Sequence, residues 1–345
     1  MSGVSSVAVV IVASRPVLLG RCLESLAAAD GPRPEEILVI LNGSKEDCSR
    51  TAERFRVRLP GLRTMDSPGL SPGAARNLAL SSARGELLFF LDDDAAIDPR
   101  YFRVLREKAS AYPDAAALGG PESTPPESGS FERCVGRALE SWVFAGPMRR
   151  RAAGFPRDSW TDERGLILCN LVLRAQALRA EGLSFDPELE RNEENLLLER
   201  LARSGRRAVH CPELRVFHQR RPTPAGFFRQ CRLSGRGRAA MTFRLPSTLR
   251  AIHVLPGAGV LMGLLAPLHP RLAAAAAAVY LAAVAADGVR LALGQGERWT
   301  AAAWHVFLVA AGHACYGAGL LEGFVLQALK RAPSPLEPEG AAVRA

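Results

Sequence analysis

The sequence predicts an α/β domain, with helices on both faces of a mostly parallel sheet, followed by a hydrophobic helical region that contacts a membrane. Two observations lead to this fold class. Apolar runs typical of buried strands alternate with amphipathic segments over the first hundred residues. After Arg250, three long stretches carry no formal charge. We therefore expect an α/β domain over residues 1–245, membrane-embedded helices over 246–331 and a flexible tail over 332–345.

The elements of the first domain follow from local signals. Val7 to Val12 is a continuous apolar run, as expected of a parallel strand that is buried on both faces. Pro16 can open a helix, and Ser71 can cap another that starts with Pro72. The expected strands span 7–12, 37–41 and 87–91, and the expected helices start at Pro16 and span 46–55 and 73–83. Residues 121–165 predict a long loop system with one short helix, followed by a helix over 193–204 and a strand near 209–217.

Composition narrows the class of protein. The net charge of +9 suits a nucleic acid, an anionic membrane surface or a phosphorylated substrate. The arginines, however, cluster beside the uncharged stretches without interleaved aromatic residues, which argues against nucleic acid. The seven cysteines form no C-x-x-C pair, so neither a disulfide framework nor a zinc cluster is indicated, and a reducing cytosol fits best. The amino-terminal apolar run is predicted to be a strand, not a signal peptide.

The uncharged stretches, residues 251–270, 272–286 and 299–321, predict two or three membrane-embedded helices. A spanning helix needs about 20 apolar residues, and the first and third stretches reach that length. Eight arginines between residues 220 and 250 place the large domain on the cytoplasmic side of the inner membrane. Lys330 and Arg331 suggest an even number of spans, in which case 251–270 would be interfacial or re-entrant.

Three consecutive aspartates, Asp92 to Asp94, follow the buried strand of five bulky apolar residues in "GELLFFLDDDAAIDPRYF". Adjacent carboxylates repel one another, so a counter-charge is expected. Capping of the next helix falls better to Asp98, which precedes Pro99. Carboxylates spaced D-x-D at the carboxyl end of a strand can hold Mg²⁺ or Mn²⁺, which in turn bind substrate phosphates.

Four segments, "VAVVIVASR", "EILVILNGS", "SPGAARNLALSSARGELLFFLDDD" and "FDPELERNEENLLLERLARSG", occur in this order. Together they resemble the family 2 glycosyltransferases, inverting enzymes with the GT-A fold, over roughly residues 5 to 220. The resemblance implies a nucleotide-sugar donor, a divalent metal and a sugar or lipid-linked acceptor. The family usually has an acidic residue where this chain has Leu41, which leaves the nucleotide base open.

The resemblance also implies a role for individual residues. Glu194 aligns with the family's catalytic base, with Glu193 as the alternative, although acidic residues also favour a helix start through the dipole alone. The remaining implied sites are Ser14, Arg15 and Asn42 for the nucleotide, Arg76, Asn77, Asp92 and Asp93 for the donor diphosphate, Asp92, Asp94 and His218 for the metal, and Asn170 for the sugar or acceptor.

Two other functions stay open on the sequence. A sugar nucleotidyltransferase also uses an α/β sheet and a metal, but it would need a glycine-rich phosphate loop with a lysine, which "ASRPVLLGR" lacks. A non-catalytic membrane scaffold with the same fold is disfavoured by the intact Asp92 and Asp94. The favoured function is metal-dependent sugar transfer in the synthesis of a cell-envelope or lipid-linked glycan.

Overall fold

The computed structural model describes residues 6–67, 69–294 and 299–331, so the predicted tail over 332–345 lies outside the described residues. An eight-stranded sheet forms the centre of the first domain, in the order β3-β2-β1-β4-β9-β6-β10-β8. The neighbours from β3 to β4 run parallel, whereas β9 is antiparallel to both β4 and β6. In that order the strands span Leu62–Asp66, Glu36–Leu41, Val7–Ala13, Leu87–Asp92, Leu171–Arg174, Ala115–Gly119, Arg207–His210 and Ser159–Thr161.

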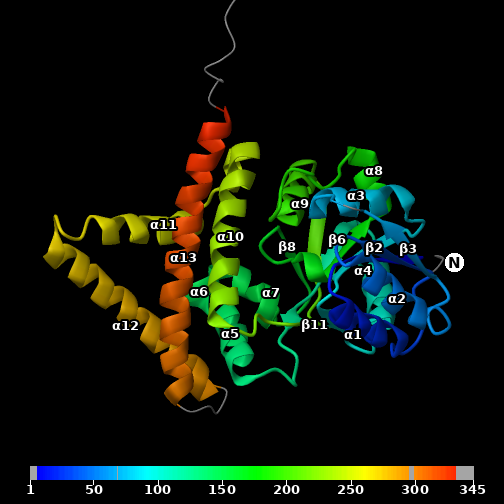
Figure 1. Ribbon diagram of the computed structural model, residues 1–345, viewed down its shortest axis with the longest axis horizontal. Coiled ribbons are helices and arrows are strands. Elements are labelled where there is room, and N and C mark those ends of the chain that lie inside the picture. The colour runs from blue at the N-terminus through cyan, green and yellow to red at the C-terminus, as the bar shows by residue number, and fades with distance from the viewer. Residues whose placement is uncertain (1–5, 68, 295–298, 332–345) are drawn as a thin grey trace, which may run out of the picture.

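Helices cover both faces of this sheet (Figure 1). Successive residues of β1 point to opposite faces, so Val9 and Ile11 join one core cluster and Ala8 and Val10 join the other. The first cluster packs against α1 (Pro16–Ala27), α2 (Lys45–Phe55) and α4 (Tyr101–Ala111). The second packs against α3 (Pro72–Ser82), α8 (Ala175–Glu181) and α9 (Glu193–Arg203). The continuous apolar runs read from the sequence are therefore strands with two buried faces.

A second, three-stranded sheet orders β5 (Ala95–Ile97), β11 (Val216–His218) and β7 (Glu122–Ser123). The predicted single strand near 209–217 is wrong, because this segment is divided between β10 of the large sheet and β11 of the small one. The predicted loop system over 121–165 is also more regular than expected. It contains β7, β8, α5 (Ser130–Glu140), α6 (Trp142–Ala145) and α7 (Arg150–Ala153).

Two long helices, α10 (Pro224–Arg244) and α13 (Trp299–Arg331), lie side by side beyond the sheet (Figure 1). Glycines allow their backbones to approach closely. A Cβ on Gly235 of α10 would lie 2.1 Å from the carbonyl oxygen of Tyr316, and one on Gly319 of α13 would lie 2.0 Å from that of Arg232. Gly319 and Gly323 form the small-xxx-small spacing of close helix pairs.

Two further helices, α11 (Ala251–Leu264) and α12 (Pro270–Gly294), form an arm that reaches away from α13 (Figure 1). In the described residues, α12 and the segment Thr300–Lys330 of α13 are the helices long and apolar enough to cross a membrane. The prediction that residues 251–270 reach spanning length is wrong, because α11 has 14 residues and contains Pro256. The second stretch extends into the longer α12 instead, past Asp287.

Asp287 fits into this apolar helix because its charge is paired. Its carboxylate accepts hydrogen bonds from the Ser141 hydroxyl and from the Arg290 guanidinium, and His305 of α13 lies 3.4 Å away. Buried charges are tolerated where partners satisfy them. Asp287 thus links α12 to α13 and to the serine that caps α6.

Candidate active site

The aspartate cluster lies where the sheet topology predicts a ligand site, at the carboxyl ends of β1 and β4. These strands are parallel neighbours, with Val12 opposite Asp92. The last residues of β1 therefore lie beside the aspartates. The prediction that Asp98 caps α4 is wrong, because Arg100 is the N-cap residue and no side chain caps this helix. Asp98 instead accepts a hydrogen bond from the Arg100 amide, directly before the helix.

Asp93 fixes this edge of the sheet. Its buried carboxylate accepts hydrogen bonds from the backbone amides of Ser14 and Arg15, at 2.9 and 3.0 Å, and also pairs with the Arg15 guanidinium. The donor contact that the sequence suggested for Asp93 stays a prediction beside these contacts. The middle aspartate positions Ser14 and Arg15, two of the predicted nucleotide-binding residues, next to Asp92 and Asp94.

Asp94 is held by cations from two directions. Arg15 lies 2.8 Å from its carboxylate, and His218 Nε2 lies 3.1 Å away. Burial raises the pKa of Asp94, but His218 and Arg15 outweigh it and lower that pKa below its ordinary range. Asp94 is therefore ionised at neutral pH, which suits a metal ligand or an anchor for a cation.

Asp92 differs from its neighbours because its carboxylate is 31% exposed. Its contact is a loose one, to Arg76 at 3.6 Å. Burial is the largest effect on the pKa of Asp92 and raises it. Arg76 lowers this pKa, the charge of Asp94 raises it further, and the net change is upward. A cation that binds beside this accessible carboxylate would relieve the repulsion between neighbouring aspartates and so stabilise the site.

The small sheet brings His218 to the aspartates. Antiparallel pairing places His218 of β11 opposite Ala95, the residue after Asp94. His218 Nδ1 lies 2.5 Å from Glu122 of β7, and Nε2 faces Asp94. Burial lowers the pKa of His218, but Cys169 and Asp94 outweigh burial and raise that pKa well above its ordinary value. Metal binding at this imidazole would therefore release a proton.

Sequence reasoning missed two residues at this site, Glu122 and Cys169. One atom each of Asp92, Cys169 and His218 lie within 4.8 Å of one another, so these groups could hold a metal ion. Burial raises the pKa of Cys169 to about 12, which keeps the thiol neutral until a metal binds. The carboxylates of Asp92 and Asp94 with the His218 nitrogen form the donor set that better suits Mn²⁺ or Mg²⁺.

Glu122 contacts Nδ1 of His218, the ring nitrogen that does not face Asp94. Arg220 lies 2.8 Å from Glu122, and with His218 it outweighs the effect of burial and lowers the pKa of Glu122 to about 2. Gly120 permits this arrangement, because a Cβ there would lie 2.0 Å from the carbonyl oxygen of Leu214. The signal in the sequence was a single glutamate in "GGPES", which nothing local distinguishes from a surface residue.

The second pair of carboxylates begins α9. Glu193 pairs with Arg76 at 2.6 Å, and both side chains are buried. Arg76, predicted beside the donor diphosphate, therefore bridges Glu193 and Asp92. It connects the start of α9 to the metal-binding edge of the sheet.

Glu194 has a different environment. Its carboxylate is buried, and within the described part of the chain no basic side chain comes within ion-pair distance of it. Burial and then Glu193 raise the pKa of Glu194, against a smaller opposite effect of Arg151. A carboxylate with a raised pKa and no fixed partner is the form that a general base requires.

Three polar side chains hold loops of the site. The side-chain amide of Asn77 donates to the carbonyl oxygen of Phe185 and accepts from its backbone amide, and the donor contact that the sequence suggested for Asn77 stays a prediction. Asn170 is fully buried between the Tyr101 hydroxyl and the Leu214 carbonyl, so its predicted contact with the sugar is wrong. Asn42 donates to the Leu70 carbonyl and stays partly exposed at the end of β2.

Residues 6–160 match the model of Glycosyl transferase family 2. This segment, a little under half of the chain, is similar to that family. The Succinoglycan biosynthesis protein ExoM of Rhizobium meliloti (strain 1021) is 28% identical over 170 residues, which cover 48% of this chain and 51% of that protein. The aligned region thus spans about half the length of this curated relative.

The fold extends the comparison beyond the matched segment. The mannosyltransferase PcManGT from Pyrobaculum calidifontis, solved in complex with GDP-Man and Mn²⁺, has a TM-score of 0.62 and 16% identity. The likeness covers 93% of this chain and 88% of that one, and so it includes most of the long helices as well as the sheet. The domain has the GT-A fold expected from the sequence motifs.

Proposed function

We propose that the protein transfers a sugar from a nucleotide-diphosphate donor to an acceptor hydroxyl, with a divalent metal and with inversion at the anomeric carbon. The observation that carries the proposal is the pairing of two carboxylate sites across Arg76. The first holds the partly exposed Asp92 and the ionised Asp94, and the second holds the buried Glu194, whose pKa is raised. One can bind a cation with the donor diphosphate, and the other can accept a proton.

Each site has a defined chemical task. Asp92, Asp94 and His218 would hold Mn²⁺ or Mg²⁺, and the cation would neutralise charge on the departing nucleoside diphosphate. Arg15, 39% exposed and held by Asp94, lies where it can contact the same diphosphate. Glu194 would remove the proton of the acceptor hydroxyl as that oxygen attacks the anomeric carbon. Attack opposite the leaving group inverts the configuration.

The comparisons support a nucleotide-sugar donor and a role in glycan synthesis. PcManGT is in complex with GDP-Man and Mn²⁺, which favours a nucleotide sugar and a divalent cation here. ExoM is a succinoglycan biosynthesis protein, which favours a role in cell-envelope glycan synthesis. Neither relative favours the sugar nucleotidyltransferase that the sequence left open.

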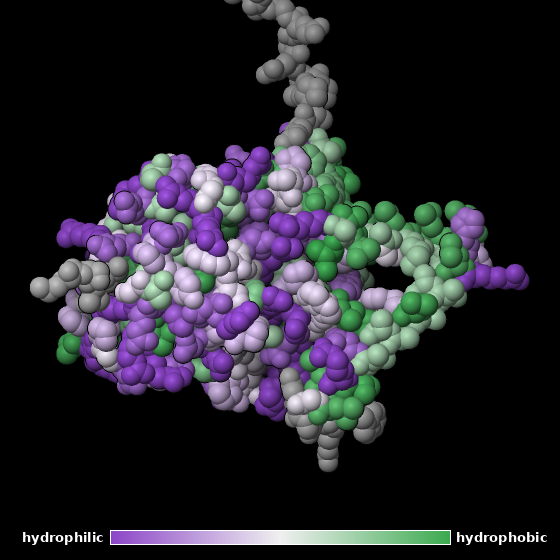
Figure 2. All heavy atoms as spheres, turned by 180° about the vertical axis from the view of Figure 1, so that it is seen from behind, coloured by the Kyte–Doolittle hydropathy of each residue, from purple (hydrophilic) through white to green (hydrophobic). Residues whose placement is uncertain are grey.

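We further propose attachment to the inner membrane, with the catalytic domain on the cytoplasmic side. Figure 2 shows apolar surface concentrated on the long helices and hydrophilic surface on the α/β domain. Leu264, Leu268 and Leu272 on the α11–α12 arm are each about 70% exposed, as 71%, 70% and 68%. Apolar patches of this kind mark membrane or protein contacts. The boundary between catalytic and membrane parts near residue 245 is proposed on the same grounds.

Calorimetry with UDP-sugars and GDP-sugars tests the donor site. We expect binding that requires Mn²⁺ or Mg²⁺, that EDTA abolishes and that Asp94→Ala weakens severely. Asp98→Ala is a matched control, because Asp98 follows the cluster by four residues and bonds the start of α4 instead. Donor binding of full strength without metal would contradict the proposal.

A further inference from the structure

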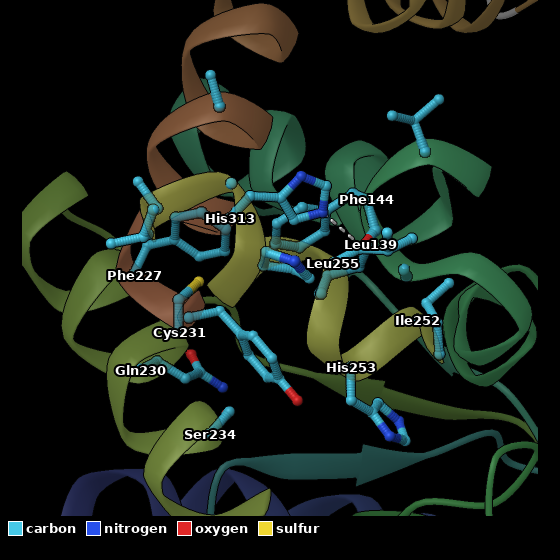
Figure 3. Close-up of a pocket in the computed structure, with 18 of the residues that line it drawn as sticks. Leu139, Phe144, Phe227, Gln230, Cys231, Ser234, Ile252, His253, Leu255 and His313 are labelled. Carbon is cyan, nitrogen blue, oxygen red and sulfur yellow. Dashed lines mark hydrogen bonds between the residues drawn. The ribbon is translucent and has the colours of Figure 1, made fainter. Parts of the chain in front are cut away.

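A large cavity adjoins the catalytic edge. Its volume is about 1260 Å³, whereas typical small-molecule sites have about 300–1,000 Å³. Side chains of α10 line one side, and residues of α5, α6 and α11 line the other (Figure 3). The lining is mostly apolar and includes Leu139, Phe144, Phe227, Ile252, Leu255 and Val260. Such a cavity suits a ligand with a large apolar part.

One end of the cavity belongs to the active site. Glu122, His218, Gln219, Arg220 and Arg221 also line it, and these residues surround the metal-binding edge. Arg220 is committed to Glu122 at 2.8 Å. Arg221 lies 3.9 Å from Asp94, at the limit of an ion pair, and its side chain is 34% exposed. Arg221 can therefore accept an anionic group that enters from the cavity.

The other end belongs to the proposed membrane region. Ala273, Ala276 and Ala277 of α12 line the cavity, whereas Leu272 and Val279 of the same helix are 68% and 73% exposed on the outside. The α11–α12 arm thus presents one face to the cavity and another to its surroundings. If the arm lies in a bilayer, as proposed above, a lipid chain can enter the cavity without crossing water.

We propose that this cavity binds the hydrocarbon chain of a lipid-linked acceptor, with the lipid phosphate at Arg221 and the acceptor sugar beyond Asn192, a cavity-lining residue two positions before the proposed base Glu194. The inference rests on the proposed function and specifies its acceptor. The occupant follows from the two ends of the cavity, because an apolar lining that ends at a cation matches a phosphate attached to a long apolar chain. A soluble glycan would leave most of this apolar surface without a partner.

The test uses the full chain in phosphatidylcholine nanodiscs, with long-chain polyprenyl phosphate as the probe. Ala276→Trp fills the cavity from α12, and Ala275→Trp, on the exposed side of the same helix, is its matched control. Gly263→Phe is a second filling variant, because a Cβ at this cavity-lining glycine meets no atom within 4 Å. Hydrolysis of the nucleotide-sugar donor is measured in parallel and reports on the catalytic centre.

We expect saturable binding of the probe that both filling variants weaken at least tenfold and that Ala275→Trp preserves. Farnesyl phosphate, with a shorter chain, and polyprenol, without the phosphate, should each bind at least tenfold more weakly. Unchanged binding in the filling variants, or uptake that does not saturate, would overturn the proposal and indicate only bulk lipid. If the unmodified protein bound the lipid probe but did not hydrolyse any nucleotide-sugar donor, the proposed function alone would be refuted.

Discussion

The two glutamates at the start of α9 allow catalysis and stability to be separated by single substitutions. Glu194→Gln removes the proposed base and should lower the rate of sugar transfer by roughly 10²–10⁴-fold, the usual contribution of general-base catalysis. Donor affinity should stay nearly intact, because the lost interaction acts in the transition state. The fold should not weaken, since Glu194 forms no ion pair with the described residues and its raised pKa shows that burial disfavours its charge.

Glu193→Gln should have the opposite profile. It leaves the buried Arg76 without its partner at 2.6 Å, and breaking one side of a buried ion pair costs about 3–5 kcal/mol. The loose contact of Arg76 with Asp92 at 3.6 Å should reduce that cost. We therefore expect a clear fall in the denaturation midpoint, with a smaller loss in transfer rate than Glu194→Gln.

Three assays measure these effects. The transfer rate is measured as nucleoside diphosphate released by the enzyme in membranes, the donor affinity by calorimetry and the stability by chemical denaturation. A double-mutant cycle of Glu193→Gln with Arg76→Gln should recover part of the lost stability, because it removes the unpaired charge. Equal and modest rate losses in both glutamate variants would refute the reasoning and leave the pair a structural helix start. A large loss confined to Glu193→Gln would move the base to that residue.

The pH dependence of stability and of the transfer rate follows from the Glu194 carboxyl. Its pKa in the folded protein is raised above the ordinary value of 4.5, so the native state binds a proton more tightly than the unfolded chain. Stability from this group is therefore full below pH 4.5 and is lost as pH rises through the folded pKa. Because a base must be deprotonated, the transfer rate should rise over this window, and its acidic limb should lie above that of an ordinary glutamate.

Three further predictions concern the metal, the helix pair and the membrane. Asp92→Asn should reduce Mn²⁺-dependent donor affinity at least tenfold in calorimetry with little change in stability, because its carboxylate is partly exposed. Gly319→Ala should lower the thermal midpoint, since its Cβ would lie 2.0 Å from the backbone of α10, whereas Gly259→Ala, with no atom within 4 Å, should be neutral or stabilising. A chain that ends at Thr248 should appear in the alkaline carbonate supernatant and the full chain should stay with the membranes, and release of the full chain by carbonate would contradict membrane attachment.

Local sequence was sufficient for the framework of the sheet. A continuous apolar run such as Val7 to Val12 can bury both of its faces, which requires helices on both sides of a parallel sheet. The carboxyl end of such a strand is an open edge, so three aspartates there already indicated a ligand site. Pro16 and Pro72 each lie at the first position of a helix, where a missing amide costs little.

What the sequence could not determine depends on contacts between distant segments. Glu122 is 96 residues from His218, and Arg76 is 117 residues from Glu193, so no periodicity or local motif connects them. The middle aspartate had the same local chemistry as its neighbours, yet only packing of β4 beside β1 directs Asp93 to the Ser14 and Arg15 amides. The uncharged length of residues 251–270 suggested a helix of spanning length, but that length carries no information on where a helix with an internal proline ends. The cavity between the long helices arises from how those helices cross, which is a property of tertiary packing alone.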